Sequence, residues 1–121
     1  MKNHVVLSDG KNHMMALVPL VLGSEAAIVQ DAVSAMAVAE DARLVEHPYV
    51  ETGTTAKAAL SILVTLLLPV NDQRDADAVA RSATISSPQP DQVLVSVVRA
   101  EGPLRWTFDR TKDGYILNNA R

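Results

Sequence analysis

Three arginines near the carboxyl-terminal end of the chain are the residues whose charge and spacing point most directly to a ligand. In the turn expected here, Arg99 and Arg105 stand directly opposite each other, and Arg110 lies nearby. Like charges opposed across two strands destabilise the pair by roughly 0.2 kcal/mol or more. A bound anion or an acidic protein surface would relieve that repulsion. We therefore predict ligand binding by Arg99, Arg105 and Arg110 together with Trp106, whose ring fits a pocket wall or the core.

Other candidates for chemistry have simpler explanations. His4 and His13 would share one face of an amino-terminal hairpin, but no third metal ligand is near in the sequence. Asp72, Asp75 and Asp77 surround an expected helix N-terminus, where negative charge is favourable without catalysis. The chain has no cysteine, no G-x-S-x-G motif and no glycine-rich phosphate loop. We therefore predict no metal and no cofactor, and we favour a protein that is not an enzyme.

The elements that must position these residues begin with a hairpin. Val5-Val6-Leu7 is a short apolar run, and Asp9-Gly10 is typical of a two-residue type I′ turn. Residues 13–18 would return as the partner strand, which Pro19 should end because proline has no N–H for the ladder.

Two main helices and a short third one are predicted next. Residues 25–44 have the i, i+3, i+4, i+7 spacing of an amphipathic helix, and residues 46–54 would be a loop. Residues 55–68 are apolar nearly all round, so a buried strand over 62–68 is the alternative. The polar residues Lys57, Ser61 and Thr65 stand four apart, which favours the helix. Asn71 or Asp72 would cap the third helix over residues 73–82.

The last thirty residues predict a three-stranded antiparallel meander. Strands are expected over 92–99, 104–110 and 115–119, and the first is apolar on both faces, which predicts cover on both sides. The second alternates, with Leu104, Trp106 and Phe108 on one face. We expect a three-residue loop before the last strand, which would place Ile116 rather than Tyr115 on that face.

Together these elements predict one α+β domain over residues 1–121, with the meander packed on the apolar helix. The element order, ending in Trp106-x-Phe108…Gly114-Tyr115-x-Leu117, resembles NTF2-like and cystatin-like proteins. In those families a sheet curls around a helix. The resemblance implies a cavity for a small molecule, or a lyase or isomerase activity with an Asp or His at the cavity floor. The leading hairpin departs from the NTF2-like order.

Composition narrows the class of partner and the compartment. The chain is 48% hydrophobic and 21% charged, which is typical of a globular protein. Its net charge of −3 argues against nucleic acid as a partner. The apolar run 58–70 is shorter than the roughly 20 residues of a membrane-spanning helix. We expect a soluble cytoplasmic protein. The alternative is export, if residues 1–26 act as a signal peptide around the apolar run 14–22.

The function hypothesis follows from apolar surface. Residues 55–70 and 92–98 carry more of it than one small chain should need, which indicates a non-catalytic binding or assembly module. We expect the partner to be a second copy, forming a homodimer, or another protein. The alternative is an NTF2-like protein with a small-molecule pocket or a lyase/isomerase-type enzyme.

Overall fold

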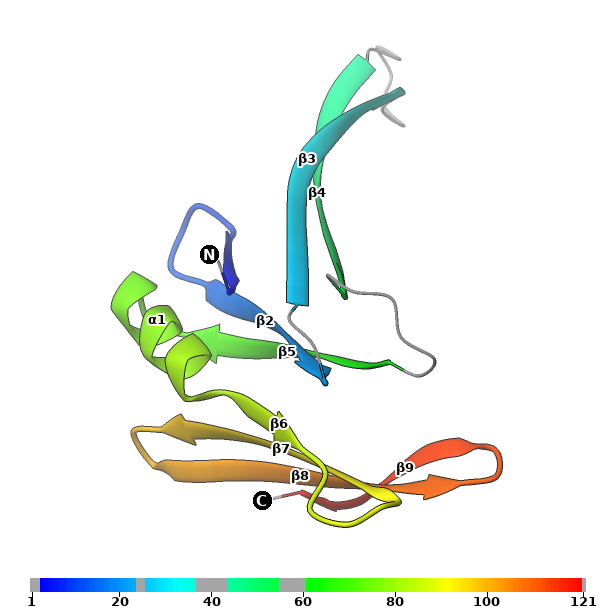
Figure 1. Cartoon of the computed structure of the whole chain (residues 1–121). Helices are drawn as coiled ribbons and strands as arrows, with labels where there is room; N and C mark the ends of the chain where they lie inside the picture. The colour runs from blue at the N-terminus through cyan, green and yellow to red at the C-terminus, as the bar shows by residue number, and fades with distance from the viewer. Residues whose placement is uncertain (1–2, 24–25, 37–43, 55–60, 121) are drawn as a thin grey trace.

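The chain folds mainly into strands that pack in layers (Figure 1). The structure, a computed structural model, describes residues 3–23, 26–36, 44–54 and 61–120. Within these residues the elements are, in chain order, β1 (Val5–Ser8), β2 (Met14–Leu22), β3 (Ala26–Met36), β4 (Leu44–Thr54), β5 (Ile62–Val70), α1 (Gln73–Ser82), β6 (Thr84–Ser86), β7 (Gln92–Arg99), β8 (Gly102–Thr111) and β9 (Gly114–Ala120). They form three antiparallel sheets, of strand order β1-β2-β5, β3-β4 and β6-β7-β8-β9.

The core lies between the β1-β2-β5 sheet and the β6–β9 sheet, and α1 lies at one end of these two layers (Figure 1). Each strand sends alternate side chains inward, because successive side chains point to opposite faces. The buried core residues come from β2, β5, α1 and β7: Ala16, Val18, Leu66, Val70, Ala76, Val79, Ala80, Val93, Val95 and Val97. Most are small or β-branched, which suits two sheets packed face to face.

The helix predicted over residues 55–68 is wrong for the part that the structure describes. Residues Ile62–Val70 form β5, which pairs with β2 along its whole length. Leu66 and Val70 are buried, whereas Leu63 and Leu67 are exposed, so the run alternates as a half-buried strand. Of the polar stripe that favoured a helix, Lys57 lies outside the described residues. The distant partner strand β2 decides the structure, and the local pattern does not contain it.

The helix predicted over residues 25–44 and the loop over 46–54 are also wrong. β3 and β4 pair antiparallel from Ala26 with Thr54 to Met36 with Leu44, while residues 24–25 and 37–43 lie outside the described residues. The alanines of this segment fit a helix and a strand equally, so the apolar spacing was ambiguous. This β3-β4 arm stands away from the other layers (Figure 1). Near its base, Thr52 Oγ1 lies 3.4 Å from Thr65 Oγ1 of β5.

The predicted α+β class with two main helices is therefore wrong. The expected NTF2-like or cystatin-like shape is wrong for the same reason. A sheet that curls around a helix requires a long apolar helix. The described residues expected to supply that helix form β5 instead. The carboxyl-terminal sheet packs against the β1-β2-β5 sheet, so the core is of the sheet-on-sheet kind.

The short third helix is confirmed as α1. Asp72 is its N-cap, and the Asp72 carboxylate accepts a hydrogen bond of 2.8 Å from the Asp75 N–H. Ala76, Val79 and Ala80 form its buried face. The cap and the buried stripe are both local features, which is why this helix could be located from the sequence.

The amino-terminal hairpin is confirmed, with a longer loop than predicted. Ser8 pairs with Met14, so residues 9–13 replace the expected two-residue turn. The Asp9 carboxylate orders this loop by accepting a hydrogen bond of 2.8 Å from the Lys11 N–H. Pro19 does not end the strand, because β2 continues to Leu22 with Pro19 opposite Thr65.

The carboxyl-terminal meander is confirmed as β7, β8 and β9, and the short strand β6 adds a fourth member. The cover that the apolar pattern of β7 predicted for its outer face is incomplete, since Leu94 and Ser96 are half-buried there and Val98 is 59% exposed. Among the residues that the structure describes, no helix has the length and apolar character needed to cross a membrane.

The turn between β8 and β9 settles which side chains share a face. Thr111 pairs with Gly114, so the turn has two residues and Leu117 lies opposite Phe108. The prediction that Ile116 joins the face of Trp106 and Phe108 is wrong. Because paired residues point to the same side, Leu117 lies on that face and Ile116 on the other.

Candidate functional site

The three predicted arginines are not brought together. Arg105 lies opposite Ser96, and Arg99 lies opposite Gly102, so the opposed arginine pair is absent. The reason is that the turn consists of residues 100–101 and not of the expected residues 101–103, which shifts the pairing of the two strands by three residues. Anion binding by these arginines stays a prediction, without the repulsion that motivated it.

Arg99 has partners within the protein. Its Nη2 donates a hydrogen bond of 2.9 Å to the carbonyl of Pro69 and lies 3.7 Å from the Asp75 carboxylate. Arg99 therefore ties β7 to the end of β5 and to α1. The backbone N–H of Arg110 donates to the Asp91 carbonyl at 2.7 Å.

The aromatic side chains of β8 belong to the core. Trp106 and Phe108 are partly buried and pack against the buried cluster between the sheets. The sequence allowed Trp106 to line a pocket or to belong to the core. In the structure it lies on the inward face of β8 and packs against the core.

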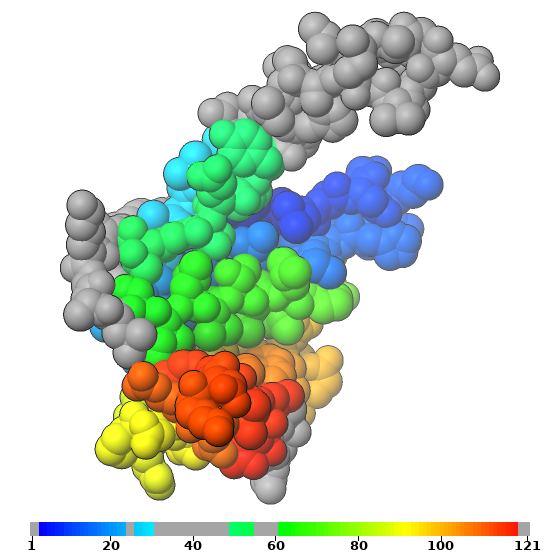
Figure 2. Space-filling view, turned by 90° about the vertical axis from the view of Figure 1, so that its right-hand side faces the viewer, coloured from blue at the N-terminus to red at the C-terminus, as the bar shows by residue number. Residues whose placement is uncertain are grey.

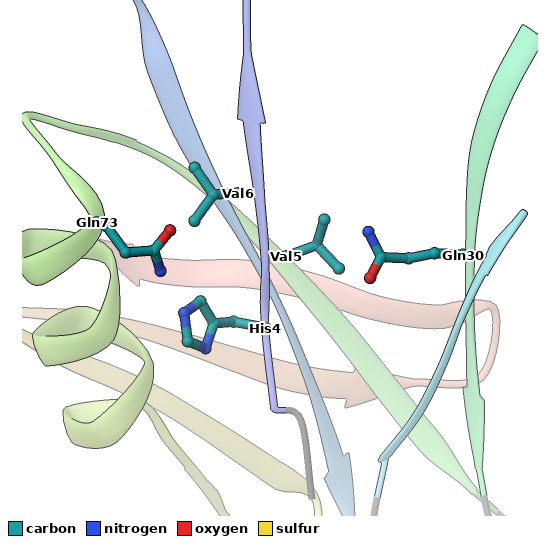
Figure 3. Close-up of a pocket in the computed structure, with 5 residues that line it drawn as sticks. All are labelled: His4, Val5, Val6, Gln30 and Gln73. Carbon is teal, nitrogen blue, oxygen red and sulfur yellow. The ribbon is translucent and has the colours of Figure 1, made fainter.

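A polar depression lies between β1, β3 and α1 (Figure 3). It has a volume of about 260 Å³ and is lined by His4, Val5, Val6, Gln30 and Gln73. The ring of His4 is turned toward α1, where Nε2 lies 2.9 Å from Asp77 Oδ1. A histidine oriented by a carboxylate is half of a catalytic arrangement, but no hydroxyl nucleophile is among these lining residues. We therefore interpret the contact between His4 and Asp77 as a structural one that holds the amino-terminal strand against α1.

Two carboxylates next to histidines are stabilised in their charged form. The hydrogen bond from the Gln73 amide lowers the pKa of Asp77, and the hydrogen bond and charge of His4 lower it further. The pKa of Asp9 is lowered chiefly by the hydrogen bond with the His13 side chain, at 2.6 Å. Both pairs join neighbouring segments of the fold. Across the described residues, no group of three or more His, Cys, Asp or Glu side chains is placed to hold a metal ion.

Among the residues whose exposure is described, several exposed apolar side chains lie along β5 and β9. Each of these strands is the last in its sheet, so within the described residues each has one edge with no paired strand. Neither strand contains a charged residue. We call these two edges, with the exposed side chains Leu63, Leu67, Tyr115 and Leu117, the open side of the protein.

The open side is continuous across the two sheets. Figure 2 shows β5, in green, directly above the orange-to-red β8–β9 hairpin. Between them is an apolar cleft of about 240 Å³, lined by Ile62, Leu63, Val64, Val93, Phe108 and Tyr115. Exposed strand edges with apolar side chains and no charge are the surfaces that soluble proteins usually protect. This surface, rather than the arginines, is the candidate site.

Sequence reasoning found part of this surface for the wrong structural reason. The apolar run that contains β5 was noted as excess surface, but it was assigned to a helix. The free edge of β9 was missed, although the lack of charge over residues 114–120 is a usable signal.

Comparison with known proteins adds no assignment, since no protein-family model, no curated protein and no solved structure matches this chain.

Proposed function

We propose that this protein is an assembly module that associates with a second copy of itself through its open side. The observation that carries the proposal is the exposure of the apolar side chains of the open side, which ranges from 39% for Leu63 to 54% for Leu67 and Leu117. The total exposed surface agrees with it. The chain exposes 8562 Å² for a mass of 13.0 kDa. A compact monomer of that mass exposes about 6,300 Å².

The surplus is large enough for an interface. It amounts to roughly 2,200 Å², and a stable protein–protein interface of standard size takes about 800 Å² from each partner. Part of the surplus belongs to the β3-β4 arm, which stands away from the other layers (Figure 1). The apolar part favours the open side, where Leu67 and Leu117 are each 54% exposed.

The chemistry of the open side also favours a second copy. A surface without charged residues on either free edge gains nothing from a strongly charged partner, and an identical uncharged surface costs little to desolvate. The small-molecule alternative depended on a sheet wrapped around a helix, so we do not propose it.

The test is the concentration dependence of mass in solution. Sedimentation velocity from about 1 to 100 µM should show the wild-type protein converting from monomer to dimer. The double variant Leu67→Lys/Leu117→Lys should raise the dimer Kd at least about tenfold, because two ammonium groups would have to be desolvated. Val98→Lys is the matched control, since Val98 is equally exposed but lies on the outer face of the β6–β9 sheet.

A wild-type protein that remains monomeric over this range contradicts the proposal. So does a Val98→Lys variant that dissociates as readily as the double variant, because the contact would then lie elsewhere.

A further inference from the structure

We propose that the two copies associate by adding β5 to β5, antiparallel about a twofold axis at Thr65, so that two β1-β2-β5 sheets become one continuous sheet. This inference rests on the proposed function and specifies the contact that carries it. Strand addition at a free edge supplies main-chain hydrogen bonds, whereas the side chains supply the fit.

Two prolines show which backbone groups of β5 point to its free edge. Pro19 of β2 lies opposite Thr65, and Pro69 lies opposite Met15. In an antiparallel ladder, opposed residues alternate between pairs that exchange both hydrogen bonds and pairs that exchange none. Proline has no N–H to exchange, so both pairs are of the second kind. The pairs are four residues apart, which is consistent with the alternation.

It follows that every second residue of β5 directs its N–H and C=O away from β2. These residues are Leu63, Thr65 and Leu67, and Pro69 completes the series with a carbonyl alone. The hydrogen bond from Arg99 to the Pro69 carbonyl agrees with this direction, because Arg99 reaches it from outside the β1-β2-β5 sheet. The free edge therefore offers three donors and three acceptors in a row.

One antiparallel register uses all three residues. Pairing Thr65 with Thr65 of the second copy places Leu63 opposite Leu67 on both sides of the axis. A shift that brings the axis to residue 66 opposes Leu63 with Pro69, which has no N–H and whose carbonyl Arg99 already occupies. A shift to residue 64 leaves Leu67 opposite a residue before β5 begins.

The side chains fit this register. Leu63 and Leu67 are exposed on the outer face, and pairing them across the axis would cover both. Threonine opposite threonine is a favourable cross-strand pair. No lysine, glutamate or other charge interrupts the strand, so the usual protection of an edge against pairing is missing.

The other free edge is better protected. The pairing of β9 with β8 is interrupted by a register shift near Phe108, so the edge of β9 is irregular at its middle. Irregular edges resist the addition of a further strand. β5 pairs with β2 without interruption and is the longer strand.

The first experiment removes one N–H from the free edge. Thr65→Pro deletes a donor that the β2 ladder does not use, and Pro69 already occupies the equivalent position in the same strand. Thr65→Val is the matched control, since it removes the hydroxyl and keeps the N–H. We expect the dimer Kd to rise at least about tenfold for Thr65→Pro and to change less than about threefold for Thr65→Val. Circular dichroism of both variants checks that the monomer is folded.

The second experiment determines the register of the β5–β5 pairing by disulfide crosslinking. The sequence contains no cysteine, so each introduced thiol can pair only with another introduced thiol. In a hydrogen-bonded antiparallel pair the Cα atoms are about 5.5 Å apart, within the range of a disulfide. Thr65→Cys should therefore form a covalent dimer under mild oxidation. Leu63→Cys alone should not, because four residues along a strand separate the two copies by about 14 Å. Mixing Leu63→Cys with Leu67→Cys should restore the crosslink.

The outcomes separate the two proposals. A dimer that is insensitive to Thr65→Pro and gives no Thr65→Cys crosslink overturns β5 pairing and leaves assembly through the open side standing. A protein that never dimerises overturns both. If Thr65→Pro unfolds the monomer, the cysteine variants decide alone, and a crosslink through Leu63→Cys by itself contradicts the register.

Discussion

His4 joins two parts of the molecule that are far apart in the sequence. Its Nε2 contacts Asp77 Oδ1, and the same oxygen accepts a hydrogen bond of 2.9 Å from the Gln73 amide. Two donors on one carboxylate oxygen favour its charged form, which is why the pKa of Asp77 lies below its ordinary value of 3.8. One ionised side chain thus connects the first strand to the helix.

This contact predicts how stability depends on acid. A carboxylate whose pKa is lower in the folded than in the unfolded protein contributes stability above the unfolded pKa, and loses it as the pH falls through the folded pKa. The free energy of unfolding should therefore fall below about pH 4. It should fall less steeply in Asp77→Asn, measured by urea unfolding from pH 5 to 2.5. Asp113→Asn, in the exposed turn before β9, is the control, and an unchanged slope in Asp77→Asn would refute the assignment.

Single residues also show the limit of reasoning from sequence. Arg99 was predicted to face Arg105 and to bind an anion or an acidic surface, whereas its guanidinium contacts the Pro69 carbonyl and the Asp75 carboxylate. The Pro69 carbonyl lies thirty residues away in the chain, and the two meet because β7 and β5 belong to opposing sheets. The β7–β8 pairing differs from the expected one by three residues, since Arg105 lies opposite Ser96 and not opposite Arg99, so the expected repulsion does not occur.

Among the elements, those with clear local signals were predicted, whereas β3, β4 and β5 were not. α1 has a capping aspartate and a buried stripe within a dozen residues, and the β7–β9 meander has short turns that join neighbours. β3 and β5 have neither a helix cap with a buried stripe nor a short turn to the strand they pair with. Their apolar residues fit a helical pattern and an alternating pattern equally, and the residues of β5 pair with residues of β2 that lie 40 to 56 positions earlier in the chain. Tertiary pairing overrode the local preference.

The cap of α1 gives a prediction at this scale. Asp72→Ala removes the acceptor of the Asp75 N–H and should lower the free energy of unfolding by about 1 kcal/mol. Chemical denaturation measures the change. Asn71→Ala is the matched control, since Asn71 is exposed and precedes the cap, and it should have little effect. Equal losses in both variants would show that Asp72 is not the cap.

For the whole molecule, the predicted shape is wrong, and the excess of apolar surface that suggested a partner stays a prediction. Among the described residues, five of the exposed large apolar side chains lie on β5 and β9: Leu63, Leu67, Tyr115, Ile116 and Leu117. A layered fold leaves strand edges at its sides, whereas the expected sheet around a helix would have hidden the same residues. The prediction of a partner thus survives as a proposal after the architecture that suggested it has been corrected.

The β3-β4 arm has a kinetic consequence. In the described residues β3 and β4 form a sheet of two strands, which can separate from its far end, one rung at a time, without opening the core. Amide protons in residues 32–36 and 44–48 should therefore exchange with deuterium much faster than those of Val93, Val95 and Val97 in β7, as mass spectrometry of peptides can measure. Equal exchange rates would mean that the arm opens only when the entire protein unfolds.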